Sequence, residues 1–222
     1  MKEILSKIAY CVEVGKINKA SPYPPAMKDQ EGADELARQA LTDGVKPDEI
    51  LELALIPAMA VVGNKFSKQE IYVPQMLMSA KAMSSAMAHL KPYFLSGETK
   101  RKGTFIIGTV TGDLHDIGKN LVAMMIEGGG WEVLDLGVDV GHDKFLKAIS
   151  ENPGAVVGLS ALLTTTMENM RKIVASIKEK YPELKILVGG APLSMDYCGK
   201  IGADFYSPDP QGAVNYLNKL VL

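Results

Sequence analysis

An imidazole flanked by two carboxylates occurs in the stretch GTVTGDLHDIGKNLVAMMIE, where Asp113, His115 and Asp116 precede Gly118. Neutral imidazole is the commonest metal ligand among side chains, and a carboxylate bound to its second ring nitrogen fixes the tautomer and makes the ligating nitrogen more basic. Glycine inside a helix costs about 1 kcal/mol relative to alanine, so Gly118 suggests a close approach to the backbone. The pattern favours a metal site at His115, with an ordinary histidine and a tight helix–sheet contact at Gly118 as the alternatives.

The first elements needed to position these residues are helices. Up to Pro92 the apolar residues recur at helical spacing, and Pro47 and Pro74 suit first-turn positions. The expected helices cover residues 3–16, 29–43, 48–64 and 73–90. Four short helices predict a bundle.

After the polar stretch PYFLSGETKRKG the spacing of the apolar residues changes, and short β-rich runs alternate with amphipathic helical stretches. The expected strands are TFIIGTV, WEVLDLG, AVVGLSAL, KILVGG and ADFYSP. This alternation is typical of a doubly wound parallel sheet, in which ligands bind beyond the carboxyl ends of the strands. Four strand ends carry small or hydroxyl residues, which predicts a long ligand lying across that edge.

The predicted fold is α/β and has two domains. We expect a four-helix-bundle cap domain at residues 1–92, a linker at 93–102, and a Rossmann-like or flavodoxin-like five-stranded parallel sheet at 103–222. Composition excludes other classes of protein. Net charge is −2 without a basic cluster, which argues against nucleic acid, and the apolar runs are too short for a membrane span. The N-terminus lacks signal-peptide features, which favours a cytoplasmic location.

Three motifs in order resemble the B12-binding domain of corrinoid methyl-transfer proteins. They are Asp113-x-His115-x-x-Gly118, Ser160-x-Leu162 and Gly189-Gly190. The stretch LIPAMAVVGNKFSKQEIYVPQMLMSAKAM resembles the helical cap that precedes this domain in methionine synthase and in methylotrophic corrinoid proteins. The resemblance covers nearly the whole chain. It is weakest at about residues 18–28, to which we assign no role.

The resemblance implies a bound cobalamin or related corrinoid whose own base is displaced from cobalt. His115 is then the lower axial ligand of the metal, Asp113 orients it, and Thr166 completes a hydrogen-bond relay at a position where methionine synthase has serine. Further contacts to the cofactor are implied near the motif, along the nucleotide tail and on the upper face of the corrin. These residues are Gly112, Leu114, Asp116, Ile117 and Gly118; Ser160, Leu162, Thr164, Gly189, Gly190, Asp209 and Pro210; and Glu52, Phe66 and Val73.

The function implied is that of a methyl carrier, whose cobalt alternates between methyl-Co(III) and Co(I). A substrate-specific methyltransferase loads the methyl group, a second methyltransferase passes it to tetrahydrofolate or coenzyme M, and a reductive activase rescues Co(II). The cap would swing aside, with PYFLSGETKRKG as the hinge. The donor stays open among methanol, methylamines, betaines and aryl methyl ethers. A corrinoid storage or chaperone protein and a B12-dependent mutase subunit are the alternative functions.

Overall fold

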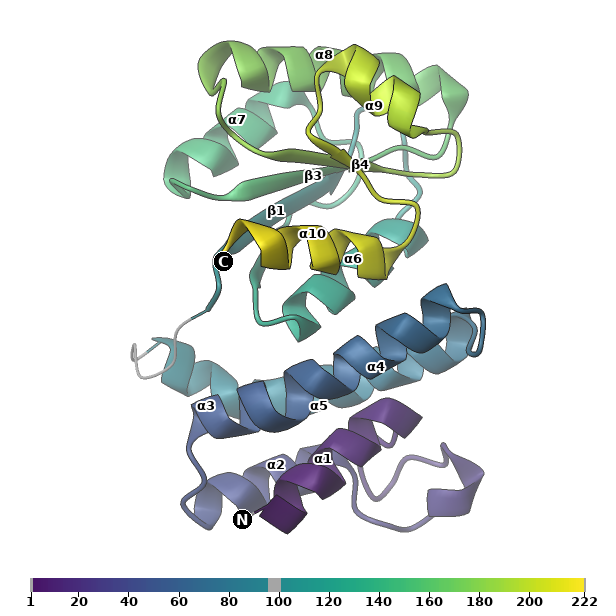
Figure 1. Cartoon of the computed structure of the whole chain (residues 1–222), viewed down its shortest axis with the longest axis vertical. Helices are drawn as coiled ribbons and strands as arrows, with labels where there is room; N and C mark the ends of the chain where they lie inside the picture. Colours follow the sequence, from purple (N-terminus) through teal and green to yellow (C-terminus); the bar gives the residue numbers. More distant parts are fainter. Residues whose placement is uncertain (1, 96–100, 222) are drawn as a thin grey trace. The chain divides into compact units, whose positions relative to one another are not determined.

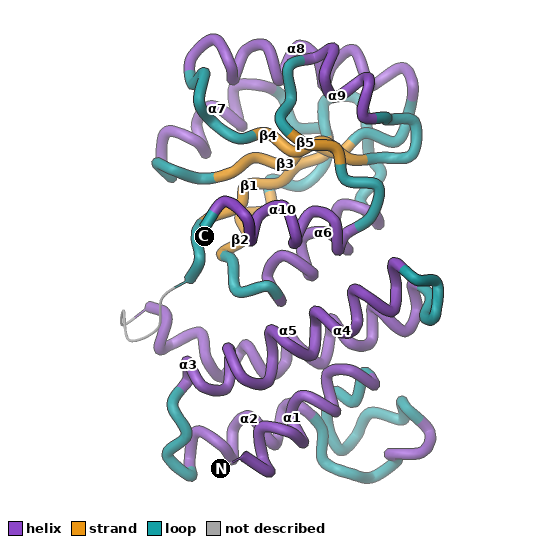
Figure 2. The backbone as a smooth tube through the Cα atoms, in the orientation of Figure 1, coloured by secondary structure: helices purple, strands orange, loops and turns teal. Residues whose placement is uncertain are grey.

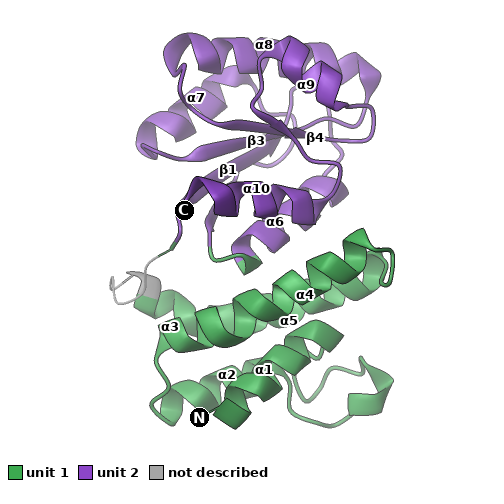
Figure 3. Ribbon diagram, viewed as in Figure 1, with its two compact units in different colours: residues 1–101, 128–130 green, residues 102–127, 131–222 purple. Residues whose placement is uncertain are grey.

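The computed structural model describes residues 2–95 and 101–221 of the chain (Figure 1). By internal contacts these residues form two compact units, residues 1–101 with 128–130 and residues 102–127 with 131–222 (Figure 3). Within the expected linker, residues 96–100 lie outside the described residues. The predicted hinge at this linker therefore stays a prediction.

The first unit is helical, as predicted. Its elements are α1 (Lys2–Val14), the 3₁₀ turn η1 (Pro25–Met27), α2 (Ala33–Thr42), α3 (Pro47–Ile50), the π-helical segment η2 (Leu51–Leu55), α4 (Ile56–Ser67) and α5 (Val73–Leu95). Pro47 opens α3 at a first-turn position, where its missing N–H costs nothing. The core of the bundle includes Ile8 from α1 and Met76, Met83 and Met87 from α5.

Two details of this unit differ from the prediction. The helix expected at 48–64 contains the five-residue π segment η2, and π turns leave no clear signal in hydrophobic spacing. Helix α5 also runs through Pro92 to Leu95 instead of ending before it. Proline removes one helical hydrogen bond to the carbonyl four residues earlier. Here that carbonyl belongs to the exposed Ala88, where water can solvate it.

The continuous helical stretch Pro47–Ser67 is long and apolar enough to cross a membrane, by length and composition alone. Ile50, Ala54, Leu55 and Val62 of this stretch are nevertheless fully buried in the structure. The core helix of a water-soluble bundle meets the same criteria, so the stretch is weak support for a membrane span.

The second unit is an α/β layer structure. Its strands are β1 (Thr104–Thr109), β2 (Glu132–Asp135), β3 (Val156–Ser160), β4 (Ile186–Gly189) and β5 (Phe205–Tyr206), and its helices are α6 (Ile117–Gly128), α7 (His142–Glu151), α8 (Thr164–Lys180), α9 (Met195–Ile201) and α10 (Pro210–Leu220). All five strands are parallel in the order β2-β1-β3-β4-β5, which confirms the predicted fold. Chain order reverses between β1 and β3, where such sheets bind ligands.

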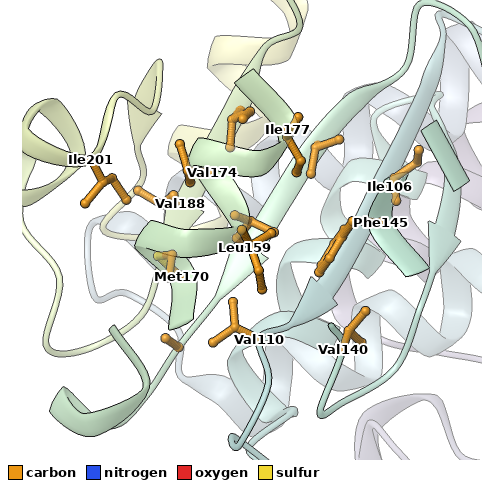
Figure 4. Packing of buried hydrophobic residues seen from close by; sticks show 14 of the residues in the cluster. Ile106, Val110, Val140, Phe145, Leu159, Met170, Val174, Ile177, Val188 and Ile201 are labelled. Atoms are coloured by element: carbon orange, nitrogen blue, oxygen red, sulfur yellow. The ribbon is translucent and has the colours of Figure 1, made fainter. Parts of the chain in front are cut away.

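The two faces of this sheet are covered differently. Helices α7, α8 and α9 pack on one face, and α6 and α10 lie on the other (Figures 1 and 2). The first face holds an apolar core that includes Ile106, Leu159 and Val188 together with Phe145 and Met170 (Figure 4). Because side chains alternate along a strand, the neighbouring positions point the other way, toward α6 and α10. At the carboxyl ends these positions are Thr109, Ser160 and Gly189.

Candidate functional site

His115 lies in the loop between β1 and α6 and is held by Asp113 of the same loop. The ring Nδ1 is 2.8 Å from Asp113 Oδ1, which also accepts a hydrogen bond from the backbone N–H of His115 at 3.1 Å. The hydroxyl of Thr109 donates to the His115 carbonyl at 2.9 Å. When Nδ1 carries the proton donated to the carboxylate, Nε2 keeps a free lone pair. The His115 side chain is 52% exposed and the Asp113 side chain is 0% exposed, so solvent reaches the imidazole but not the carboxylate.

The second oxygen of Asp113 binds the loop that follows β3. Asp113 Oδ2 accepts hydrogen bonds from the N–H of Leu162 at 2.7 Å, the N–H of Leu163 at 3.3 Å and the hydroxyl of Thr166 at 2.8 Å. Leu163 is the N-cap residue of α8, so the carboxylate lies at the start of that helix, where the helix dipole favours negative charge. One side chain thus joins the two strand ends at the point where chain order reverses.

These contacts set the charge of Asp113. Burial raises the pKa of the carboxyl, but hydrogen bonds from Leu162, from the His115 ring and from Thr166 outweigh it and hold the pKa well below its ordinary value. Asp113 is therefore ionised at neutral pH and acts only as an acceptor. This state suits a carboxylate that must hold the Nδ1 proton of a metal-binding histidine.

Thr166 has one hydroxyl proton and two acceptors within reach. Its Oγ1 lies 2.8 Å from Asp113 Oδ2 and 2.9 Å from the carbonyl oxygen of Leu163. The proton can therefore point to the carboxylate, or turn to the carbonyl and leave Oγ1 free to accept. The predicted relay His115–Asp113–Thr166 is connected in the structure, although its chemical role stays a prediction.

The predicted glycines divide into two kinds. A Cβ added to Gly118 would meet nothing within 4 Å, so a close helix–sheet contact does not explain this glycine. At Gly189 the nearest atom would be the Ser207 carbonyl oxygen at an ordinary 3.6 Å. Gly190 differs, because its φ is +139° and a Cβ would lie 1.8 Å from the carbonyl oxygen of Ala161. The backbone itself requires glycine at 190, whereas at 118 glycine leaves space open.

Large apolar side chains surround His115 without being buried. Leu114 is 71% exposed and Ile117 is 70% exposed, and Leu162 after β3 is 42% exposed. These side chains are therefore available to contact an apolar ligand. Gly112, with φ +82°, begins this segment in a conformation that favours glycine.

The remaining predicted residues of this unit lie at other strand and helix ends. Ser160 ends β3 half-buried, and its hydroxyl has no hydrogen-bond partner among the described residues. Thr164 is exposed at the start of α8. Asp209 caps α10 by accepting from the N–H of Gly212 at 2.8 Å, and Pro210 opens that helix. Asp116 accepts from the side chain of Asn120 at 3.0 Å and so serves α6.

The three predicted cap residues belong to the helical unit and are described within it. Glu52 is exposed in the π segment, Phe66 is half-buried near the end of α4, and Val73 is 36% exposed at the start of α5. Their contacts to a ligand stay predictions. Sequence reasoning missed the N–H of Leu163 and the hydroxyl of Thr109, because backbone donors carry no residue signature and a strand-end threonine is common.

The site fits a metal that arrives inside a cofactor. Among the described residues no group of three or more His, Cys, Asp or Glu side chains could hold a metal ion. A metal at His115 must therefore bring most of its own ligands, as a macrocycle does. The exposed apolar side chains and the open space at Gly118 suit a large, partly apolar group. Fold and site together fit a protein that binds a preformed metal cofactor at the edge of a parallel sheet.

Comparison with known proteins identifies that cofactor. A family model described as a B12 binding domain matches residues 103–214, and a second one with the same description matches residues 28–91. The chain is 40% identical over 190 residues to the trimethylamine corrinoid protein of Methanosarcina barkeri, covering 84% of this chain and 88% of that protein. It is 37% identical over 180 residues to dimethylamine corrinoid protein 3 of Methanosarcina acetivorans, covering 80% and 84%.

A solved structure agrees with these matches. The methanol:cobalamin methyltransferase complex MtaBC of Methanosarcina barkeri contains a chain that superposes with a TM-score of 0.82 at 27% identity, covering 99% of this chain and 80% of that one. The chain belongs to the corrinoid proteins with B12-binding domains. The predicted family, corrinoid cofactor and role as a carrier of methyl groups are confirmed.

Proposed function

We propose that the protein accepts a methyl group from a methylated amine through one methyltransferase and delivers it to a second, with His115 as the lower ligand of the cobalt. When bound, the corrinoid supplies the metal that carries the methyl group. The observation that carries the proposal is the pairing of His115 Nδ1 with the buried Asp113 carboxylate, because it leaves Nε2 as the exposed donor.

In this chemistry the protein controls whether Nε2 of His115 carries a proton. Nε2 must be unprotonated to bind a metal, and a freed Nε2 can take a proton from water because the ring is exposed. The resulting imidazolium is stabilised by the ionised Asp113, which Thr166 and three backbone N–H groups hold in place. Ligand release is therefore coupled to proton uptake at Nε2, while Asp113 keeps its charge.

The amine donor is supported by the relatives' names. The trimethylamine and dimethylamine corrinoid proteins are 40% and 37% identical to this chain, whereas the chain of the methanol complex is 27% identical. The MtaBC complex also supports direct docking with a methyltransferase. The proposal also includes a second methyltransferase, a reductive activase for Co(II) and a cytoplasmic location. Stopped-flow transfer of the methyl group, with trimethylamine and methanol tested in parallel, distinguishes one donor from the other.

Electron paramagnetic resonance of the Co(II) form tests the ligand. We expect an axial nitrogen splitting that changes when only the protein's histidines carry nitrogen-15. The pattern should disappear in His115→Ala and persist in His142→Ala, because His142 lies exposed at the start of α7. A spectrum that is insensitive to the label, or unchanged in His115→Ala, would show that the cofactor keeps its own base.

A further inference from the structure

Gln211 in the first turn of α10 carries a buried acceptor that the described chain does not satisfy. Its side chain is 5% exposed, and its Nε2 donates to Asn215 Oδ1 at 2.9 Å. Its Oε1 is buried and has no hydrogen-bond partner among the described residues. A buried amide oxygen without a donor costs about 1–3 kcal/mol, so it calls for a partner from outside the chain.

The orientation of this amide follows from its neighbour. Asn215 Oδ1 accepts only, so the atom of Gln211 that faces it is the NH₂ group. In this arrangement the oxygen is the unpaired atom of the Gln211 amide. A group that binds there must be a hydrogen-bond donor.

This acceptor lies on the face of the sheet that carries the expected tail site. Helix α10 covers this face together with α6, whose first turn contains Gly118 (Figure 2). The alternation of the strands turns Ser160 and Gly189 toward the same face, and the two are paired across β3 and β4. The Ser160 hydroxyl also has no hydrogen-bond partner in the part of the chain that the structure describes. Small side chains and unpaired polar atoms thus occur together on one face.

Local contacts join the start of α10 to these strand ends. The N–H of Ser207 donates to the Val188 carbonyl at 3.1 Å, beside Gly189. A Cβ added to Gly212, the neighbour of Gln211, would lie 2.7 Å from Ser207 Oγ. Adjacent strands are about 4.8 Å apart, so Ser160 and the end of β5 are separated by about 10 Å, well within the length of a nucleotide.

We propose that Gln211 Oε1 accepts a hydrogen bond from the nucleotide tail of the corrinoid, from a hydroxyl or N–H group on its base or its sugar. The proposal deepens the function above, since it concerns the same cofactor. It makes Gln211 a residue that selects among corrinoids, because a tail without a donor at this place would leave the buried oxygen unpaired. Rejection of ligands that lack a matching donor is a general property of buried polar groups.

Binding measurements on the cofactor-free protein test the proposal. The variants are Gln211→Met, which keeps the length of the side chain and removes the acceptor, and Gln211→Glu, which keeps an acceptor. Gln39→Met makes the same change at an exposed position of α2 and serves as the control. The ligands are cobalamin, a cobamide with a hydroxybenzimidazole base, and cobinamide, which lacks the nucleotide. Dissociation constants come from absorbance and from fluorescence of the single tryptophan, Trp131.

We expect Gln211→Met to bind tailed corrinoids about 10-fold more weakly, the equivalent of one hydrogen bond of about 1.4 kcal/mol, and to bind cobinamide like the parent. Gln211→Glu should retain more affinity than Gln211→Met. A loss only with the hydroxylated base places the donor on the base, and an equal loss with both tailed forms places it on the sugar. Both outcomes support the proposal.

Two outcomes overturn the proposal. Unchanged affinity of Gln211→Met for all three ligands means that a water molecule satisfies Oε1. An equal loss with cobinamide means that Gln211 only supports the fold, and circular dichroism of the unloaded variants shows whether folding is impaired. The nitrogen pattern of His115, recorded on the same samples, is expected to persist in Gln211→Met, so failure here is distinguishable from failure of the proposed ligand.

Discussion

The hydroxyl of Thr166 and the carboxylate of Asp113 meet at 2.8 Å inside the protein, where Thr166 is 4% exposed and Asp113 is not exposed at all. Through this contact α8 is hydrogen-bonded to the carboxylate that also binds the ring of His115. The pair joins the loop after β1 to the first turn of the helix after β3.

Thr166→Val should raise the pKa of Asp113, because it removes one of the hydrogen bonds that stabilise the carboxylate. We expect release of the histidine ligand to move to higher pH in the loaded variant, because a carboxylate that has lost one hydrogen-bond donor is more basic and stabilises the imidazolium more strongly. Absorbance titration of the Co(II) form measures this shift. Thr166→Ser keeps the hydroxyl and should titrate like the parent; an identical titration in Thr166→Val would remove threonine from the relay.

Asp113→Asn should weaken ligation of cobalt by His115 by about 10–100-fold, the usual effect of losing the carboxylate behind a metal-binding histidine. The neutral amide no longer makes the imidazole more basic and can present its NH₂ group to Nδ1, which disfavours the required tautomer. Axial nitrogen splitting as a function of pH measures the effect. Asp143→Asn is the matched control, since the Asp143 side chain is 92% exposed in the first turn of α7. Equal ligation in both variants would contradict the orienting role.

Asp113 should also make folding sensitive to acid. Its pKa is lowered in the folded protein, so its contribution to stability is complete above the unfolded value of about 3.9 and is lost as pH falls toward the folded value. At pH 7 we expect Asp113→Asn to lower the free energy of unfolding by about 1–3 kcal/mol. Urea titrations at pH 7 and at about pH 3 should show a smaller difference between parent and variant in acid. A constant difference would mean that the charge of Asp113 does not contribute.

We expect Gly118→Val to impair corrinoid binding and Gly190→Ala to impair the stability of the fold. A side chain at 118 meets only open space, so the unloaded Gly118→Val protein should melt like the parent but lose corrinoid. At 190 even one methyl group would collide with the Ala161 carbonyl in a backbone conformation that favours glycine, so the unloaded Gly190→Ala protein should be destabilised. Thermal melting and corrinoid titration distinguish the two. Normal corrinoid binding by a folded Gly118→Val protein would remove Gly118 from the cofactor site.

The sequence predicted most of the fold because its signals are local and periodic. Strand-length apolar runs in the second half and helical spacing in the first half are strong patterns, and both appear in the structure. The π segment Leu51–Leu55 and the passage of α5 through Pro92 escaped prediction. For α5, solvation of the single Ala88 carbonyl lets the helix continue, and neither feature has a periodic signature in the sequence.

The candidate site was predicted unevenly for a similar reason. The motif around His115 shows which residues are present, and spacing alone suggested the contact between Asp113 and His115. The different reasons for Gly118 and Gly190 depend on backbone angles and on distant carbonyls. The unpaired oxygen of Gln211 also escaped notice, because the partners of an amide are a property of the fold and glutamine is common on helices.

The imidazole of His115 is exposed and the carboxylate of Asp113 is buried, and this difference affects how fast the ring protons exchange with water. Asp113 and Thr166 are buried, and the half-exposed imidazole is the member of the trio that meets water. Protons therefore enter and leave through the ring, and the Nδ1 proton, protected between ring and carboxylate, exchanges more slowly than one at Nε2. In deuterated solvent the two ring positions should therefore behave as a fast and a slow site, and a cofactor seated over the ring would close the fast one.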